Sequence, residues 1–304
     1  MTEGELSGAV VAVTGAGRGL GLAYALDLAS RGASVVVSTR ARPAGEPGSA
    51  EAAVAQIVAR GGRAAACPLS VEADDAGAQL LDAALRAFGR LDGLVNNAGV
   101  PEAKSLHKQT MAEFRSVFEV NFFGTLNVTL PIYRHMREQG GGRIVITTSA
   151  AGLHGVHGMA AYSSSKAALV GLMRVLALEG ASRDVKANAI APYALTGMTE
   201  GYLPHPVAEA VPPEAVAPIV SWLVSPECPL NGETLVAGAG RVRRAVRIEN
   251  MGLEVGPDPA PTQLSAATEA LLDLAEWSMP PDGNAAFEAF LAAKPPRWPP
   301  GDLR

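Results

Sequence analysis

The stretch Val10-Val11-Ala12-Val13-Thr14-Gly15-Ala16-Gly17-Arg18-Gly19-Leu20-Gly21 joins a short apolar run to a glycine-rich loop near the start of the chain. Residues 20–30 then predict a helix that ends at Arg31-Gly32. Glycines in such a loop permit a tight turn and a close approach of the backbone to a pyrophosphate, and the helix N-terminus offers free N–H groups to the anion. The stretch therefore predicts a strand–loop–helix unit that binds a dinucleotide.

Apolar runs and helical faces alternate along the first 245 residues. The runs are rich in β-branched residues and suit strands that are buried on both faces, as in a parallel sheet; they lie at 10–13, 35–37, 94–95, 144–146 and 234–236. Residues 188–190, just before Pro192, are strand-like as well. Between them the apolar spacing predicts helices at 20–30, around 54–58 and 80–88, and at 111–136, 160–179 and 213–224. This alternation predicts a three-layer α/β fold with a doubly wound parallel sheet.

Composition and charge exclude several classes of protein. Apolar residues make up 48% of the 304 residues, which is ample for a core, and the net charge of −5 argues against a nucleic-acid-binding protein. The two cysteines, Cys67 and Cys228, suit neither a disulfide framework nor a metal cluster, so no metal is expected. Because no signal-peptide pattern and no apolar run of membrane-spanning length is evident, we expect a cytoplasmic protein without membrane contact.

The last segment, residues 246–304, differs from residues 1–245 in composition. It holds nine of the 22 prolines and supplies the whole negative charge, with four basic and nine acidic side chains. Helices are predicted at 265–277 and 284–293. The segment is either a partly ordered appendage or an acidic, Pro-rich extension that packs on the body or on a partner subunit. Its aromatic side chains favour packing; they are Trp277, Phe287, Phe290 and Trp298.

A second pattern predicts proton chemistry at an oxygen atom. Tyr162 and Lys166 are four residues apart and share one helix face, and Ser149 lies thirteen residues before Tyr162. A cation beside a phenol stabilises the phenolate and lowers its pKa, and a nearby hydroxyl can hold a substrate oxygen. Taken alone, the pair could equally be an ordinary Tyr and Lys on a helix surface.

Five motifs together are similar to those of the short-chain dehydrogenase/reductase family: Thr14-Gly-x3-Gly19-x-Gly21, Asn96-Asn97-Ala98-Gly99, Asn121, Ser149 and Tyr162-x3-Lys166. The resemblance covers roughly residues 6–245. It implies a Rossmann-type fold with NAD or NADP across the C-terminal ends of the strands. It also implies that Tyr162 is the general acid or base, that Lys166 binds the nicotinamide ribose and lowers the pKa of Tyr162, that Ser149 holds the substrate oxygen and that Asn121 anchors a water in the proton relay.

The resemblance further implies which residues surround the cofactor. These are Gly15, Arg18, Gly19, Leu20, Gly21, Thr39, Arg40, Leu69, Ser70, Asn97, Ala98, Gly99, Tyr162, Lys166, Pro192, Leu195 and Thr196. An acidic residue after the second strand would accept the ribose 2′-hydroxyl of NAD. Thr39 stands at that point and Arg40 follows it, and arginine pairs well with a phosphate. The chain therefore favours NADP, with NAD as the alternative. Leu69 replaces the acid that often holds the adenine, so Ser70 or backbone would serve there.

Four residues are candidates for contact with the substrate: His154, His157, Tyr193 and Met198. The two histidines lie between Ser149 and Tyr162, a stretch that lines the substrate pocket in the resembled family, although a structural or exposed role is the alternative for each. A metal role for them is not expected, because no third ligand is apparent.

Further segments narrow the resemblance, among them 23–26, 191–194, 213–218 and 238–240. They are similar to the group formed by the (3R)-hydroxyacyl-CoA dehydrogenase unit of type 2 peroxisomal multifunctional enzymes and its bacterial single-domain relatives. The implied function is an NADP-dependent oxidoreductase acting on a ketone or secondary alcohol, such as a 3-oxoacyl thioester or a polyketide-like metabolite. The alternatives are an NAD-dependent (3R)-hydroxyacyl-CoA dehydrogenase and a non-redox epimerase, dehydratase or cyclase. Residues 111–136 and 160–179 form the subunit interface in relatives, so a homodimer or homotetramer is expected.

Overall fold

The structure is a computed structural model that describes residues 4–43, 45–195, 210–256 and 258–295. The chain divides into two compact units, Met1–Ala245 and Val246–Arg304. The expected site residues Thr196 and Met198 lie outside the described residues, as does Trp298 in the second unit.

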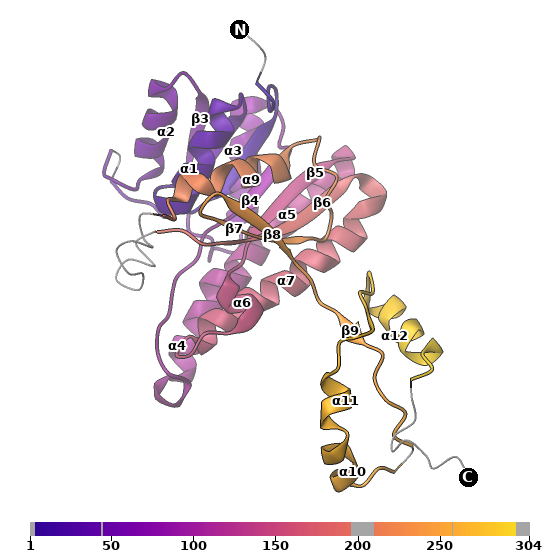
Figure 1. Cartoon of the computed structure of the whole chain (residues 1–304). Helices are drawn as coiled ribbons and strands as arrows, with labels where there is room; N and C mark the ends of the chain where they lie inside the picture. The colour runs from indigo at the N-terminus through magenta and orange to yellow at the C-terminus, as the bar shows by residue number, and fades with distance from the viewer. Residues whose placement is uncertain (1–3, 44, 196–209, 257, 296–304) are drawn as a thin grey trace, which may run out of the picture. The chain divides into compact units, whose positions relative to one another are not determined.

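The first unit is built on an eight-stranded sheet in the order β3-β2-β1-β4-β5-β6-β7-β8 (Figure 1). Its strands are β1 (Val10–Thr14), β2 (Ser34–Thr39), β3 (Arg63–Pro68), β4 (Gly93–Asn96), β5 (Gly142–Thr147), β6 (Val185–Pro192), β7 (Thr234–Gly238) and β8 (Arg241–Ala245). Adjacent strands from β3 to β7 pair in parallel. The chain reverses its direction of winding between β1 and β4, which is the crevice where open α/β sheets bind ligands.

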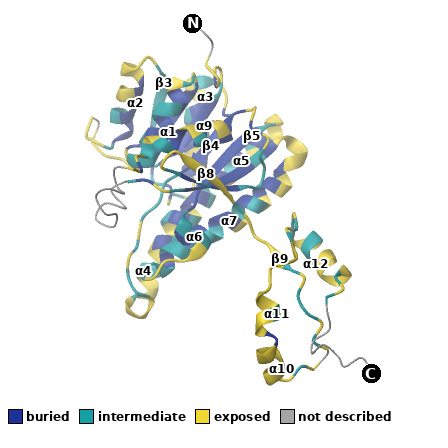
Figure 2. Ribbon diagram, viewed as in Figure 1, coloured by how far each residue is buried: buried dark blue, intermediate teal, exposed yellow. Residues whose placement is uncertain are grey.

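Helices cover both faces of the sheet, so the predicted three-layer fold is confirmed (Figure 1). One face is covered by α1 (Gly19–Ser30), α2 (Ala50–Ala59) and α9 (Ala217–Val224); the other by α3 (Ala76–Phe88), α5 (Gly124–Gln139) and α7 (Ala160–Gly180). Along β1, Val11 and Val13 belong to the first apolar cluster, whereas Val10 and Ala12 belong to the second. The run is apolar throughout because side chains alternate between two buried faces. Figure 2 shows the resulting buried sheet.

Three elements differ from the prediction. The expected helix at 111–136 consists of α4 (Met111–Phe118), a π-helical segment Glu119–Phe123 and then α5. β3 was not predicted because its Ala64–Ala66 centre lacks the β-branched residues typical of strands. β8 was also not predicted; it pairs antiparallel with β7 at the sheet edge and exposes Arg241, Arg243 and Arg244.

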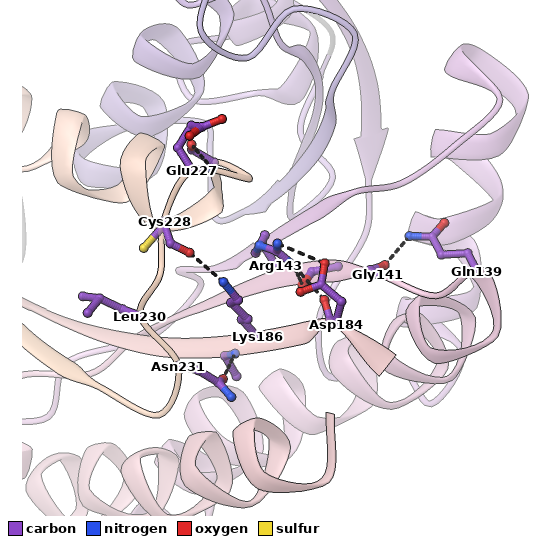
Figure 3. A network of polar contacts seen from close by, with 12 residues as sticks. Gln139, Gly141, Arg143, Asp184, Lys186, Glu227, Cys228, Leu230 and Asn231 are labelled. Carbon is purple, nitrogen blue, oxygen red and sulfur yellow. Dashed lines mark hydrogen bonds and ion pairs between the residues drawn. The ribbon is translucent and has the colours of Figure 1, made fainter. Parts of the chain in front are cut away.

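Polar contacts tie together the N-terminal ends of β5 and β6 (Figure 3). The Arg143 guanidinium donates to the Asp184 carbonyl at 2.7 Å and to its carboxylate at 3.2 Å. The Lys186 ammonium donates to the Cys228 carbonyl at 2.9 Å. The crevice lies at the C-terminal ends of the strands. This network is at their N-terminal ends, so it stabilises the fold at the end of the sheet away from the crevice.

The second unit has little core of its own. It contains α10 (Pro261–Ala266), α11 (Thr268–Leu272), α12 (Gly283–Ala292) and a two-stranded ribbon of β9 (Glu249–Asn250) with β10 (Trp277–Ser278). The expected helix at 265–277 is correct only in part: residues 265–266 and 268–272 are helical, and the helix ends before Asp273. The Asp273 carboxylate accepts from the Ala275 N–H, a local turn that competes with a helix. Ala267 is the only buried residue in the part of this unit that the structure describes.

Candidate active site

A cleft of about 390 Å³ opens at the C-terminal ends of β1, β2, β3 and β4. Most residues predicted to bind a cofactor line it: Gly15, Arg18, Gly19, Leu20, Gly21, Thr39, Arg40, Leu69, Ser70, Asn97, Ala98 and Gly99. The sequence did not single out several other lining residues, namely Ser38, Gly48, Val71, Glu72, Val100, Pro101 and Val120. Ser38 lies in β2, Val120 lies in the helical segment Glu119–Phe123, and the others lie in loops; only the fold brings them together at the cleft.

Two glycines of the loop, Gly15 and Gly21, are packed so tightly that a side chain would not fit at either position. Gly15 has a φ of +64°, and a Cβ there would lie 2.9 Å from the Cα of Ala98. A Cβ at Gly21 would lie 2.6 Å from the amide nitrogen of Asn97. The N-terminus of α1, which follows the loop, has no side-chain cap, so its first N–H groups remain available to bind an anion. The first residues of α1, Gly19–Gly21, line the cleft.

Thr14 and Asn97 hold the two sides of the crevice together. The Thr14 hydroxyl accepts from the N–H groups of Asn97 at 3.0 Å and Ala98 at 3.1 Å. The Asn97 amide donates in turn to the carbonyl of Thr14 at 3.1 Å and that of Gly15 at 3.3 Å. β1 and β4 are thereby held in register at their carboxyl ends, which gives the cleft a rigid floor.

The electrostatics of the cleft rim are dominated by arginines. Arg18, Arg40 and Arg42 line the cleft and are exposed, and none of them forms an ion pair within the described residues. The rim also carries Glu72, whose carboxylate accepts from the Ser70 hydroxyl at 3.1 Å. These three guanidinium groups can bind a phosphate, because arginine offers several donors in a planar fork.

Asn121 sits in the π-helical segment and is fully buried. Its amide oxygen accepts from the Val100 N–H at 2.8 Å, and its amide nitrogen donates to the Val100 carbonyl at 3.1 Å and the Ser165 hydroxyl at 3.1 Å. A π-turn widens a helix locally and is frequent at functional sites. Here it directs Asn121 between the β4 loop and α7.

Lys166 is buried on α7 next to Asn121. Its ammonium donates to the Thr147 carbonyl at 2.8 Å, and a Cβ placed on Gly99 would lie 3.3 Å from the Lys166 Nζ and 3.1 Å from the Asn121 amide oxygen. Since Gly99 also lines the cleft, these two side chains reach its inner wall. Burial lowers the pKa of Lys166 to about 8.

Tyr162 and Ser149 complete the cluster. Burial raises the pKa of the Tyr162 phenol, and a hydrogen bond with the Ser149 side chain opposes that rise. The Ser149 hydroxyl also accepts from the Ala151 N–H at 3.1 Å at the start of α6 (Ala150–His154). The Lys166 Nζ lies 5.9 Å from the centre of the Tyr162 ring and donates to the Thr147 carbonyl. The expected lowering of the Tyr162 pKa by this cation stays a prediction.

The other predicted residues lie away from the lining of this cleft. His154 and His157 are exposed, and Tyr193 is 52% exposed just after β6, which ends at Pro192. The Leu195 N–H donates to the Val211 carbonyl at 2.7 Å. Their contact with a cofactor or substrate stays a prediction.

Comparisons with known proteins give consistent matches. A family model described as short chain dehydrogenase matches residues 9–205. A short-chain type dehydrogenase/reductase of Mycobacterium tuberculosis is 42% identical over 269 residues, which cover 87% of this chain and 94% of that protein. The crystal structure of a short chain dehydrogenase from Mycobacterium avium superposes with a TM-score of 0.78 at 36% identity, covering 88% of this chain and 96% of the other.

A type 2 peroxisomal multifunctional enzyme, the group that the sequence resembles, is also among the matches. The mouse peroxisomal multifunctional enzyme type 2 is 43% identical over 240 residues, which cover 78% of this chain. Only 32% of that enzyme is matched, so this chain spans about a third of its length. No helix in the described parts of the chain is long and apolar enough to cross a membrane.

Proposed function

The chain belongs to the short-chain dehydrogenase/reductase family of oxidoreductases, and we propose that it is an NADP-dependent enzyme that interconverts a ketone and a secondary alcohol. The observation that carries this proposal is the junction at Gly99, where a rigid, arginine-rimmed cleft meets the buried Asn121 and Lys166 side chains. The cleft suits a dinucleotide, and the buried cluster suits proton transfer at a carbonyl oxygen.

The residues of the cleft fit a nicotinamide dinucleotide. Gly15 and Gly21 leave no room for side chains, and the uncapped first residues of α1 line the cleft, as binding of a pyrophosphate requires. Asn97, Ala98 and Gly99 form the opposite wall. When bound, the nicotinamide would supply or accept the hydride.

The arginine rim supports NADP rather than NAD. Arg40 follows Thr39 at the end of β2, where an acidic side chain would otherwise bind a ribose hydroxyl and repel a phosphate. Arg18 and Arg42 line the same cleft and are likewise exposed. Together these groups provide positive charge for a 2′-phosphate.

The proton chemistry is assigned to Tyr162. Its phenol donates a proton to the substrate oxygen during reduction and takes it back during oxidation. Lys166 stabilises negative charge on the phenol, Ser149 holds the substrate oxygen, and Asn121 anchors the end of the proton path at the Val100 backbone. Pro192, Leu195 and Thr196 are proposed to flank the nicotinamide, and His154, His157, Tyr193 and Met198 the substrate.

The substrate is proposed to be a small-molecule ketone, with 3-oxoacyl thioesters and polyketide-like ketones as the first classes to test. An NAD-dependent (3R)-hydroxyacyl-CoA dehydrogenase is the second candidate, because the mouse peroxisomal relative matches most of the first unit. A homodimer or homotetramer is proposed as well, since exposed Leu130 on α5 and Val175 and Leu178 on α7 form apolar surface on the two long helices.

The test follows NADPH absorbance after mixing the purified chain with a panel of ketones and 3-oxoacyl thioesters. We expect turnover with at least one of them, with NADH less effective. Tyr162→Phe is expected to abolish turnover while leaving NADPH binding nearly intact, because the phenylalanine ring keeps the packing and loses the proton. Tight NADPH binding without any turnover would overturn the redox proposal, and retained turnover in Tyr162→Phe would remove Tyr162 from the acid–base role.

A further inference from the structure

The loop between β2 and α2 packs directly on the glycine loop of the cleft. A Cβ placed on Gly17 would lie 2.1 Å from the Gly48 carbonyl oxygen and 3.2 Å from the Gly48 Cα. These atoms belong to the main chain, so the two loops meet backbone against backbone. Gly17, unlike Gly15, does not have a positive φ. The close approach of Gly48, and not an unusual backbone conformation, therefore calls for a glycine at position 17.

The end of the β2–α2 loop that meets Gly17 has a fixed seat. Ser49 is fully buried and caps α2, because its hydroxyl accepts from the Ala52 N–H at 3.1 Å. Ala50, the first residue of α2, is 1% exposed and belongs to the apolar cluster that α1 also packs in. Gly48 has a φ of +87°, a conformation that glycine adopts readily. The loop is thus anchored to the core directly beside the glycine loop.

Two consecutive turns lead from this seat back to the rim of the cleft. The Ser49 N–H donates to the Glu46 carbonyl at 3.0 Å, and the Glu46 N–H donates to the Pro43 carbonyl at 3.1 Å. Pro43 follows Arg42 directly, and its ring fixes φ and so stiffens the turn. Arg42 and Gly48 both line the cleft. A change in the seat of Gly48 is therefore transmitted along the turns to Arg42.

The position of Arg42 matters because of what a guanidinium can bind. Its planar donors bind a phosphate through paired hydrogen bonds, which form only in the correct orientation. Arg42 is exposed, so holding its side chain in one orientation costs conformational entropy, and a loosely held loop would add to that cost. The two turns and the seat on the glycine loop hold the backbone of this arginine in advance, which favours binding.

We propose that Gly17 and Gly48 are positioning residues that seat the β2–α2 loop on the glycine loop and thereby hold Arg42 at the 2′-phosphate of NADP. A side chain at position 17 would displace the loop and move Arg42 away from the phosphate, whereas Arg40, which directly follows β2, would stay in place. The inference rests on the proposed function, in which the arginine rim binds that phosphate.

The experiment measures the dissociation constants of adenosine 2′,5′-bisphosphate and adenosine 5′-monophosphate for the full chain by isothermal titration calorimetry. The two probes differ only in the 2′-phosphate, so the ratio of their dissociation constants reports binding of that group, and no turnover is needed. Gly17→Ala is expected to reduce the preference for the bisphosphate on the order of tenfold, the effect of one hydrogen bond to a charged group. A disturbance of the glycine loop alone would weaken both probes alike and leave the ratio unchanged.

Two further variants test the route through the loop. Ser49→Ala removes the cap at the seat without touching the glycine loop, and it should reduce the preference in the same direction even if Gly17→Ala folds poorly. Arg42→Met removes the guanidinium and should reduce the preference at least as much as Gly17→Ala. In the Arg42→Met background, Gly17→Ala and Ser49→Ala are expected to leave the remaining preference unaltered, because the group that they position is gone.

Two controls make matched changes outside the lining of the cleft. Gly180→Ala would place a Cβ 2.4 Å from the Val185 carbonyl oxygen, a backbone clash comparable to that of Gly17→Ala. Thr110→Ala removes the cap of α4, where the Thr110 hydroxyl accepts from the Glu113 N–H at 3.3 Å. Both variants are expected to lower the melting temperature and to keep the wild-type preference for the bisphosphate.

A wild-type preference that Gly17→Ala and Ser49→Ala both leave unchanged would overturn the inference, as would a further loss of preference in the Arg42→Met background. Equal affinity of the wild type for the two probes would instead overturn the assignment of NADP, and with it the role of the loop.

Discussion

The buried ammonium of Lys166 is expected to make stability rise and activity fall as pH increases above about 8. Burial lowers its pKa from 10.5 to about 8. Between these values the unfolded chain binds more protons at this group than the folded chain, so the contribution of Lys166 to the free energy of unfolding rises as pH increases from about 8 to 10.5. Over the same range the cation beside Tyr162 is lost, so kcat is expected to fall.

This prediction is checked by urea unfolding and kcat measurements across that range. Lys166→Met carries no titrating group, so its unfolding free energy should lack the extra rise with pH that the wild type shows. Parallel stability curves for the two proteins would contradict the assigned pKa of Lys166.

Arg40 is the residue expected to decide cofactor preference. Arg40→Asp replaces an exposed cleft-rim cation with an anion, which would repel a 2′-phosphate and accept a ribose hydroxyl. We expect NADPH binding to weaken about tenfold or more while NADH binding is spared or improved. Arg60→Asp makes the same charge change on an exposed residue outside the cleft and should preserve the NADPH-to-NADH ratio. Equal losses for both cofactors in Arg40→Asp would contradict this assignment.

The spacing of polar residues made much of the candidate site predictable. Asn121, Ser149, Tyr162 and Lys166 could be selected from their order and separation, and the structure brings Asn121 and Lys166 to the wall at Gly99. Glu72 and Ser38 could not be selected, because they reach the cleft only through the crossover geometry of β2 and β3.

At the scale of elements, strong β-branched runs identified five strands and the strand-like residues 188–190 indicated a sixth, β6. The alanine-rich β3 and the arginine-rich β8 carried too weak a signal. The π-helical segment was hidden because one additional residue in a turn hardly changes the apolar spacing of a long helix. These missed elements shape the site directly: β3 leads to the cleft residues Leu69 and Ser70, and the π-turn directs Asn121.

The junction of the glycine loop with α1 provides a prediction for an element. Gly21→Ala would place a Cβ 2.6 Å from the Asn97 amide nitrogen and also against the Gly15 carbonyl. We expect a lower melting temperature and weaker NADPH binding, because the two walls of the crevice must move apart. Gly171→Ala is the matched control in α7, where a Cβ meets nothing within 4 Å, and it should be neutral or stabilise by about 0.5–1 kcal/mol. Similar melting temperatures for the two variants would contradict this account.

At the scale of the whole molecule, the second unit is too sparsely packed to be stable alone. Phe287, Phe290 and Leu291 on α12 are 63%, 76% and 67% exposed. A unit of this size ordinarily needs a buried apolar core. The proposal that residues 246–304 pack on the body or on a partner subunit follows from this shortage.

Its test is limited proteolysis of the full chain. The Phe287→Ser, Phe290→Ser double variant is expected to be cleaved within the second unit several times faster than wild type. Val58→Ser, which changes an exposed apolar residue on α2, should not alter the cleavage rate. Wild-type cleavage as fast as that of the double variant would indicate an appendage that does not pack.

The arginines of β8 bear on how copies of this protein can meet. An outermost strand presents unpaired backbone groups that could template addition of further strands and so lead to aggregation. Arg241 and Arg243 would bring like charges together if two such edges joined, whereas Arg244 is paired with Glu233 of the same chain at 2.7 Å. These charges disfavour the joining of two β8 edges, which is consistent with the proposed association through the long helices α5 and α7.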